Sequence, residues 1–171
     1  WGVIYLGNFA GALGTAALVF LAGQYLSGHG AVGRVVLDLA LAKATLPFGR
    51  AFFLGVLCNV LVCLAVWLSL GARTTADKLL AVLFPVSAFV AAGFEHSVAN
   101  MYLVPVGLFV KAGASPELWA QMGAAANAYA GLTWPAFAWS LVPVTLGNIV
   151  GGGGLVGAVY WFVYLRRRGQ R

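Results

Sequence analysis

The segment AFVAAGFEHSVANMYL, residues 88–103, places a glutamate and a histidine side by side in an otherwise apolar run. The run extends from Lys78 to Phe109, whereas about 20 residues are enough to cross a hydrocarbon core of about 30 Å. Irregular backbone at membrane depth is tolerated only where it is buried in protein or lines a water-filled cavity. We therefore expect a broken membrane helix here. Its interruptions are Pro85, Gly93, Glu95, His96 and Pro105.

The composition indicates a protein of the lipid bilayer. Of the residues, 62% are hydrophobic and 8% are charged, whereas a soluble domain carries about 25% charged residues. The net charge of +6 is concentrated in the terminal RRRGQR, so no nucleic-acid-binding face is expected. Cys58 and Cys63 share one apolar run at a spacing that suits neither a zinc site nor a disulfide framework. We expect both to be small buried hydrophobic residues.

The whole chain, residues 1–171, is predicted to form a single transmembrane domain. Each of three further apolar segments fits one crossing: 1–26, 51–71 and 141–165. Residues 27–50 predict an outer loop followed by a short interfacial helix. The stretch 111–134 predicts a mixed loop in which Ser115 starts a helix.

Positive charge sets the expected orientation. The basic tail, residues 166–171, places the C-terminus in the cytoplasm by the positive-inside rule. Counting back, the link carrying Arg73 and Lys78 is also cytoplasmic, and the segment that carries Lys43 lies outside, against the rule. We expect a multi-pass membrane protein. Because Trp1 opens inside an apolar segment without an initiator methionine or a cleavable signal, we also expect residues before it.

A repeat relates the first and last spans. At an offset of 140 residues, LGNFAGALG at Leu6 aligns with LGNIVGGGG at Leu146. Glycines at this spacing let helix backbones approach closely, although such faces also recur in unrelated membrane helices. The match favours an inverted three-plus-three repeat with discontinuous helices. The chain would then supply the third to sixth spans, and roughly 100 further residues would carry two more. The matching residues are Gly7, Asn8, Gly11 and Gly14, with Gly147, Asn148, Gly151 and Gly154.

The broken helix predicts an anion site. A half-helix starting near Phe94 would place Glu95, His96 and Ser97 in its first turn, where unpaired N–H groups and the positive dipole end favour an anion. A neutral histidine, with an unperturbed pKa of about 6.5, can hydrogen-bond a weak-acid anion or lend it a proton. Phe89 would form an apolar constriction over the site. The alternatives are a structural Glu–His pair between helices and an ordinary core- or lipid-facing phenylalanine.

Three stretches carry a resemblance to a known family: GVLCNVLVCLAVWLSLGARTTADK, FVAAGFEHSVANMYLVPVG and LVPVTLGNIVGGGGLVGAVYWFVYLR. From about Lys43 onward the chain resembles the second half of the formate/nitrite transporter family, most closely its formate channels. The resemblance implies an aquaporin-like homopentamer of six-helix protomers. Each protomer would have its own pore for small monovalent anions such as formate.

The resemblance also assigns residues by motif. It implies that His96 is the central pore histidine, Phe89 a constriction residue and Asn59 of the LCN motif a polar pore-lining residue. Val62, one turn on, would also line the pore, and Lys43 matches a vestibule lysine that attracts anions. The family's first broken helix, which brings a threonine and the opposing constriction residues, would precede Trp1.

Several functions stay open on these residues. Formate, nitrite, hydrosulfide and lactate are all small weak-acid anions that this lining would serve, with or without proton co-transport. A different class is a membrane redox subunit that uses His29 and His96 as haem or metal ligands, which must converge. His29 lies in a glycine-rich loop and His96 at mid-span, so we expect them not to meet. The sequence predicts a transporter, not an enzyme, and no cofactor.

Overall fold

The computed structural model describes residues 1–166, and within that range every regular element is helical. The expected basic tail falls largely on Arg167, Arg168 and Arg171, which lie outside the described residues. The elements are α1 (Gly2–Leu21), η1 (Gln24–Leu26), α2 (Ala31–Ala44), α3 (Phe48–Gly71), α4 (Thr75–Ala91), α5 (Ser97–Gly113), α6 (Pro116–Gln121), η2 (Ala126–Tyr129), α7 (Trp134–Ile149), η3 (Val150–Val156), α8 (Gly157–Tyr160) and η4 (Trp161–Leu165).

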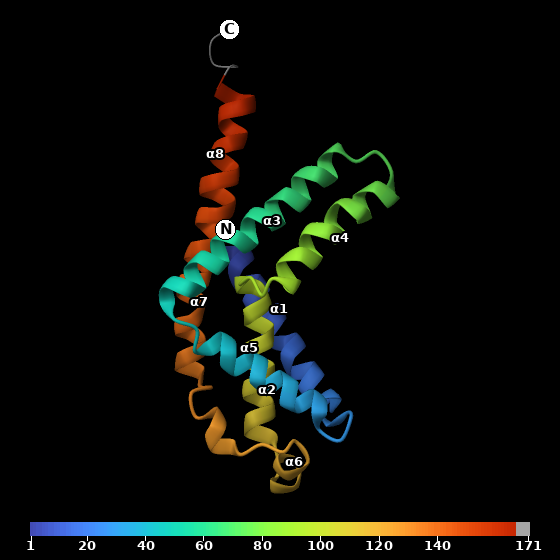
Figure 1. The fold of residues 1–171 in the computed structure, drawn as a ribbon, viewed down its shortest axis with the longest axis vertical. Helices are drawn as coiled ribbons and strands as arrows, with labels where there is room; N and C mark the ends of the chain where they lie inside the picture. The colour runs from blue at the N-terminus through green and yellow to red at the C-terminus, as the bar shows by residue number, and fades with distance from the viewer. Residues whose placement is uncertain (167–171) are drawn as a thin grey trace. The chain divides into compact units, whose positions relative to one another are not determined.

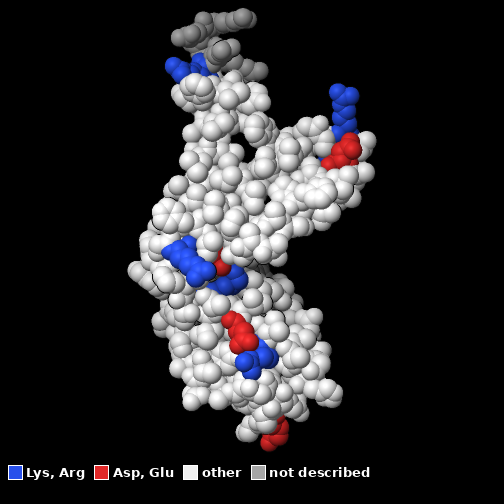
Figure 2. All heavy atoms as spheres, viewed as in Figure 1, with Lys and Arg blue, Asp and Glu red and all other residues white. Residues whose placement is uncertain are grey.

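Within residues 1–166, three helical stretches are long and apolar enough to cross a membrane. They are α1, α3 and the run Ala126–Leu165, with mean hydropathies of 1.7, 2.5 and 1.5. Figure 2 shows the visible face of the helices largely free of charge, with charged side chains gathered at a few places such as the link between α3 and α4. Their length and apolar composition suit membrane crossings, as the composition of the chain predicts.

The chain folds into two compact units. The first unit comprises Trp1–Pro47 and Ser97–Val142, and the second comprises Phe48–His96 and the chain from Pro143 onward. The predicted broken helix is confirmed, because α4 ends at Ala91 and α5 begins at Ser97. Its two halves belong to different units.

In the first unit, α5 packs against both α1 and α2 (Figure 1). Leu37, Met101, Val104 and Val110 are fully buried there. The backbones of α2 and α5 approach so closely that a Cβ at Gly107 would overlap that of Ala40, which is how small residues let membrane helices associate.

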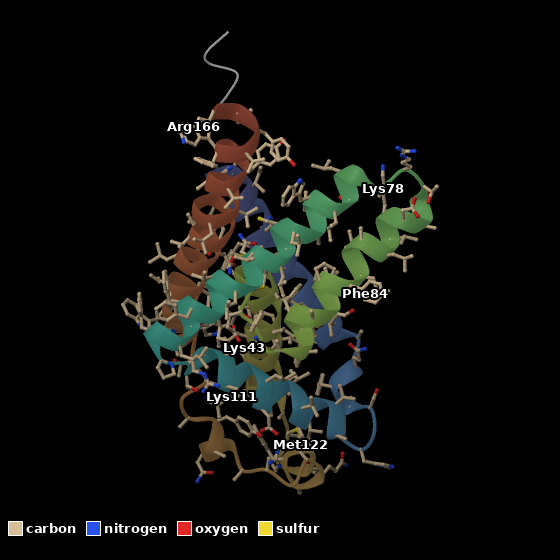
Figure 3. The ribbon with its side chains drawn as sticks, turned by 45° about the horizontal axis from the view of Figure 1, so that its top comes forward. Lys43, Lys78, Phe84, Lys111, Met122 and Arg166 are labelled. Carbon is tan, nitrogen blue, oxygen red and sulfur yellow. The ribbon has the colours of Figure 1, made fainter. Side chains whose placement is uncertain are left out.

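Polar side chains anchor the loops of this unit. The Lys111 ammonium donates to the carbonyls of Tyr129 (2.7 Å) and Leu132 (2.8 Å). Arg34 bonds the Asp38 carboxylate at 3.0 Å, and the same carboxylate accepts from the Tyr129 hydroxyl at 2.6 Å. Lys111 lies in the last turn of α5 and is labelled in Figure 3. The predicted start at Ser115 is confirmed, because its hydroxyl caps α6.

In the second unit, α3 and α4 form an antiparallel hairpin (Figure 1). A capping box starts α4: the Thr74 hydroxyl accepts from the Asp77 N–H, and the Asp77 carboxylate accepts from the Thr74 N–H, both at 3.1 Å. Hydrogen bonds to the Asp77 carboxylate, first from the Thr74 side chain and then from the Thr74 backbone, lower the pKa of Asp77. Lys78 stands at this end of the hairpin (Figure 3), and the short polar link is where the sequence predicts it.

Two predicted boundaries are wrong. The last span begins at Trp134 and not at 141, because Thr133 accepts from the Ala136 N–H at 3.2 Å and Pro135 suits a first helical turn. It then continues through the π-helical segment η3. The first span ends at Leu21 and not at 26, because Gly23 takes the left-handed conformation, with φ of 72°.

Candidate pore site

The break between α4 and α5 is shaped by a left-handed turn at Gly93, with φ of 66°. After this turn the Phe94 N–H bonds the Phe89 carbonyl at 3.0 Å, and the Glu95 N–H bonds the Leu54 carbonyl of α3 at 3.3 Å. The backbone is thus held by α4 and α3 before α5 begins at Ser97. The prediction that Glu95 and His96 lie in the first turn of the half-helix is therefore wrong. Only Ser97 does.

A group of residues that we call the asparagine clamp fixes this break within the second unit. It consists of Asn59, Asn148 and the carbonyls of Gly55 and Glu95. The buried Asn148 amide donates to Gly55 O and to Glu95 O, both at 2.9 Å. The Asn59 amide in turn donates to Asn148 O at 2.6 Å. One carboxamide has two donor hydrogens, so Asn148 uses both to join α3 to the break.

Glycines let the clamp close. A Cβ at Gly147 would overlap the Phe52 carbonyl of α3, and one at Gly151 would overlap the Val56 carbonyl. Each contact is with backbone, which cannot move aside as a flexible side chain can. The backbone of α3 is therefore in direct contact with the backbone of the last span, α7 and η3, as glycine faces allow in membranes.

The other glycines of the repeat have different surroundings. A Cβ at Gly154 would come no closer than 3.9 Å to a neighbouring atom, that of Val150. On α1, a Cβ at the corresponding positions would have no described atom within 4 Å apart from its chain neighbours and its own helix backbone. Those positions are Gly7, Gly11 and Gly14.

His96 lies directly beside Phe89. Their ring centroids are 6.2 Å apart and the rings are inclined by 29°, and both side chains are half-buried. A titratable ring and an apolar ring thus share one side of the break. Their neighbours Glu95 and Ser97 are 5% and 6% exposed, and both interact with the surrounding protein.

The remaining predicted residues fall on two helices. Asn59 and Val62 lie on α3 of the second unit and are half-buried. Lys43 lies in the last turn of α2, in the first unit, and is half-buried. No group of three or more histidine, cysteine or acidic side chains that could hold a metal occurs in residues 1–166.

Asn148 is the residue that sequence reasoning did not assign to the site. The sequence did contain a signal, because Asn148 is the asparagine of the repeated LGN motif. The glycines alone were enough to explain the repeat as a helix-packing face, so the asparagine was given no role. Only the bond to Glu95 O, 53 residues away along the chain, shows that the asparagine organises the break.

Comparison with known proteins gives close matches. The formate/nitrite transporter family model matches residues 1–162. The formate channel FocA of Escherichia coli (strain K12) is 46% identical over 97% of this chain and 59% of its own length. Its counterpart from Haemophilus influenzae is 44% identical over 92% of the chain and 56% of its own length. The chain thus spans less than two thirds of these relatives.

Solved structures agree. A pentameric formate channel with formate bound matches with a TM-score of 0.92 and 41% identity, covering 97% of this chain and 66% of that one. A second FNT family ion channel matches with a TM-score of 0.74 and 35% identity, covering 92% and 56%. The predicted fold class, an all-helical aquaporin-like membrane protein with broken helices, and the predicted resemblance are both confirmed. The chain belongs to the formate/nitrite transporter family.

Proposed function

We propose that this protein is a membrane channel or transporter for formate or a closely related small monovalent anion. The family membership and the names of the relatives support the class of substrate. The observation that carries the proposal is the break itself, where the His96 ring lies 6.2 Å from the Phe89 ring in the middle of an apolar span.

The geometry supports a division of roles at the break. α5 begins at Ser97, so the positive dipole end of its first turn favours an anion near Glu95 and His96. His96 would hydrogen-bond the anion or lend it a proton. Phe89 would exclude hydrated ions, because apolar constrictions act as barriers to them.

Other residues would line or feed the path. Asn59 offers its carbonyl oxygen while its amide is held by Asn148, and Val62 adds an apolar surface one turn further along α3. Lys43 would concentrate anions at the outer mouth. In keeping with the structural relative, we propose that the protein is a homopentamer with a pore in each protomer. It would lie in a prokaryotic inner membrane with a cytoplasmic C-terminus.

The experiment is transport by the protein expressed from its complete gene and reconstituted in liposomes. Formate uptake is measured from pH 5 to pH 8 for the wild type and for His96→Asn, which keeps a polar side chain of similar size but does not titrate. The variant should assemble normally and have a flattened or shifted pH profile. A profile identical to that of the wild type would remove His96 from the mechanism.

A substrate panel completes this test. Nitrite, hydrosulfide and lactate are compared with formate in the same liposomes, since one relative is named a formate-nitrite transporter. Faster transport of one of these anions would reassign the substrate within the family. If none of the four anions crosses faster than in empty liposomes, the proposed function is wrong.

A further inference from the structure

Gly152, in the π-helical segment η3, is buried against two side chains of α3. A Cβ built on it would lie 2.5 Å from the Asn59 amide nitrogen and 2.9 Å from the Cys63 sulfur. Real Cβ atoms essentially never come within 3.0 Å of such a neighbour. Asn59 and Cys63 are four residues apart and so share one face of α3. The Asn59 carboxamide therefore occupies the volume that a side chain at position 152 would need.

The neighbouring glycines are in different situations. A Cβ at Gly151 would meet the backbone of Val56, so that glycine sets the distance between the two helices. A Cβ at Gly157 would lie 3.5 Å from the Gly152 carbonyl, which is an ordinary contact. Gly152 differs from both because the side chains of Asn59 and Cys63, and not backbone atoms, lie where its own side chain would be.

The Asn59 carboxamide has little freedom to move away. Ordinary van der Waals contact begins at 3.4 Å, so its nitrogen would have to retreat by about 0.9 Å from an added Cβ. The same nitrogen is held 2.6 Å from the Asn148 carbonyl. The helices cannot separate without losing their contact at Gly151. An added methyl group would therefore turn the carboxamide out of the asparagine clamp.

We propose that Gly152 is a positioning residue for Asn59: its missing side chain leaves the space from which the Asn59 amide binds the Asn148 carbonyl. The inference rests on the proposed function in that Asn59 is proposed to line the anion path. A side chain at position 152 then changes which anions pass as well as how fast they pass, because it redirects a polar group of the lining.

A double-mutant cycle tests this in the complete protein, with formate and acetate uptake and thermal unfolding in detergent as readouts. Gly152→Ala should lower formate uptake by about tenfold and shift the formate-to-acetate ratio in the same direction as Asn59→Ala does. In the Asn59→Ala background, adding Gly152→Ala should lower formate uptake by less than about twofold, because the effects of residues that act through one contact are not additive. Gly157→Ala is the matched control and should keep wild-type uptake.

Two further variants separate the neighbours of Gly152. Gly152→Ala with Asn59→Ser should recover most of the melting temperature of Asn59→Ser alone, whereas Gly152→Ala with Cys63→Ala should recover little, because the overlap with the Asn59 nitrogen is the larger one. This comparison works even if Gly152→Ala is too unstable for uptake measurements.

Several results would overturn the inference. They are additive losses from Gly152→Ala and Asn59→Ala, recovery through Cys63→Ala in place of Asn59→Ser, or an unchanged formate-to-acetate ratio in Gly152→Ala. An inactive wild-type protein would instead refute the proposed function, and the melting temperatures would still decide whether Gly152 and Asn59 are coupled.

Discussion

The ring of Phe89 lies beside His96, the histidine of the break, and is half-buried. A half-buried ring can face either a pore or a neighbouring helix. The proposed role is to exclude hydrated ions at a narrow apolar point. Because this role depends on the bulk of the ring, a smaller side chain removes the barrier while leaving His96 in place.

We therefore expect Phe89→Ala to raise leak conductance and to reduce the discrimination between formate and lactate severalfold. Single-channel or liposome-flux recordings with formate, acetate and lactate measure both effects. Phe84, exposed on the same helix, supplies the control, because Phe84→Ala should leave the selectivity unchanged (Figure 3). Wild-type selectivity in Phe89→Ala would show that the constriction lies elsewhere.

For single residues, the sequence identified which residue types belong to the break but not the backbone conformation that holds them. The pair Glu95–His96 stands out because charged groups are rare in apolar spans. The predicted helix start was wrong. After the turn at Gly93, the next two backbone N–H groups donate to the carbonyls of Phe89 and Leu54, so no helix begins there. A bond to Leu54, on another helix, has no signature in local sequence, and neither does the bond from Asn148.

The element α4 depends on its first turn. Thr74 and Asp77 exchange hydrogen bonds there, and this capping box satisfies two backbone donors at once. Hydrogen bonds from the side chain and the backbone of Thr74 to its carboxylate lower the pKa of Asp77. A carboxyl group whose pKa is lower in the folded state stabilises the fold above its unfolded pKa, and that stabilisation is lost as the pH falls through the folded value.

Thr74→Ala should therefore speed amide hydrogen exchange over residues 74–78, and the excess over wild type should shrink in strong acid, where Asp77 is protonated and the wild-type box is already weakened. Exchange measured by mass spectrometry at several pH values, corrected for the intrinsic rate, reports this. Ser115→Ala, at the cap of α6, serves as a control that should leave residues 74–78 unaffected. Equal exchange in Thr74→Ala and wild type at neutral pH would contradict the assignment.

Helix positions were predicted well where apolar length and cap residues agree, as at the Ser115 start. They were predicted poorly where prolines were read as interruptions. Pro85 and Pro105 lie inside α4 and α5, since neighbouring helices and local adjustments can compensate for a proline in a membrane helix. The break came from a glycine instead.

For the whole molecule, the charge distribution bears on the proposed role of Lys43 in attracting anions. Lys43 lies in the last turn of α2, and the visible helix surface carries few other charges (Figure 2). If Lys43 acts at long range, Lys43→Ala should slow formate uptake severalfold at low ionic strength and much less at physiological salt, where the Debye length is about 8 Å.

The measurement is initial uptake at a series of salt concentrations, with Lys43→Arg as the charge-preserving control. Loss of the same size at every salt concentration would assign Lys43 a local structural role.

The family and the helical fold could be inferred from sequence because composition and motifs extend over the whole chain. The clamp could not be, because it joins residues that only the folded chain brings together.

The bonds that tie Lys111 to two loop carbonyls have a consequence for covalent chemistry. The sequence holds three lysines, Lys43, Lys78 and Lys111. An ammonium group that donates to Tyr129 O and Leu132 O is a poor target for an acylating reagent, which requires the free amine. Lys78, exposed in the first turn of α4 next to the link between α3 and α4, should be modified readily. A membrane-impermeant amine reagent would then report on which side of the bilayer that link lies.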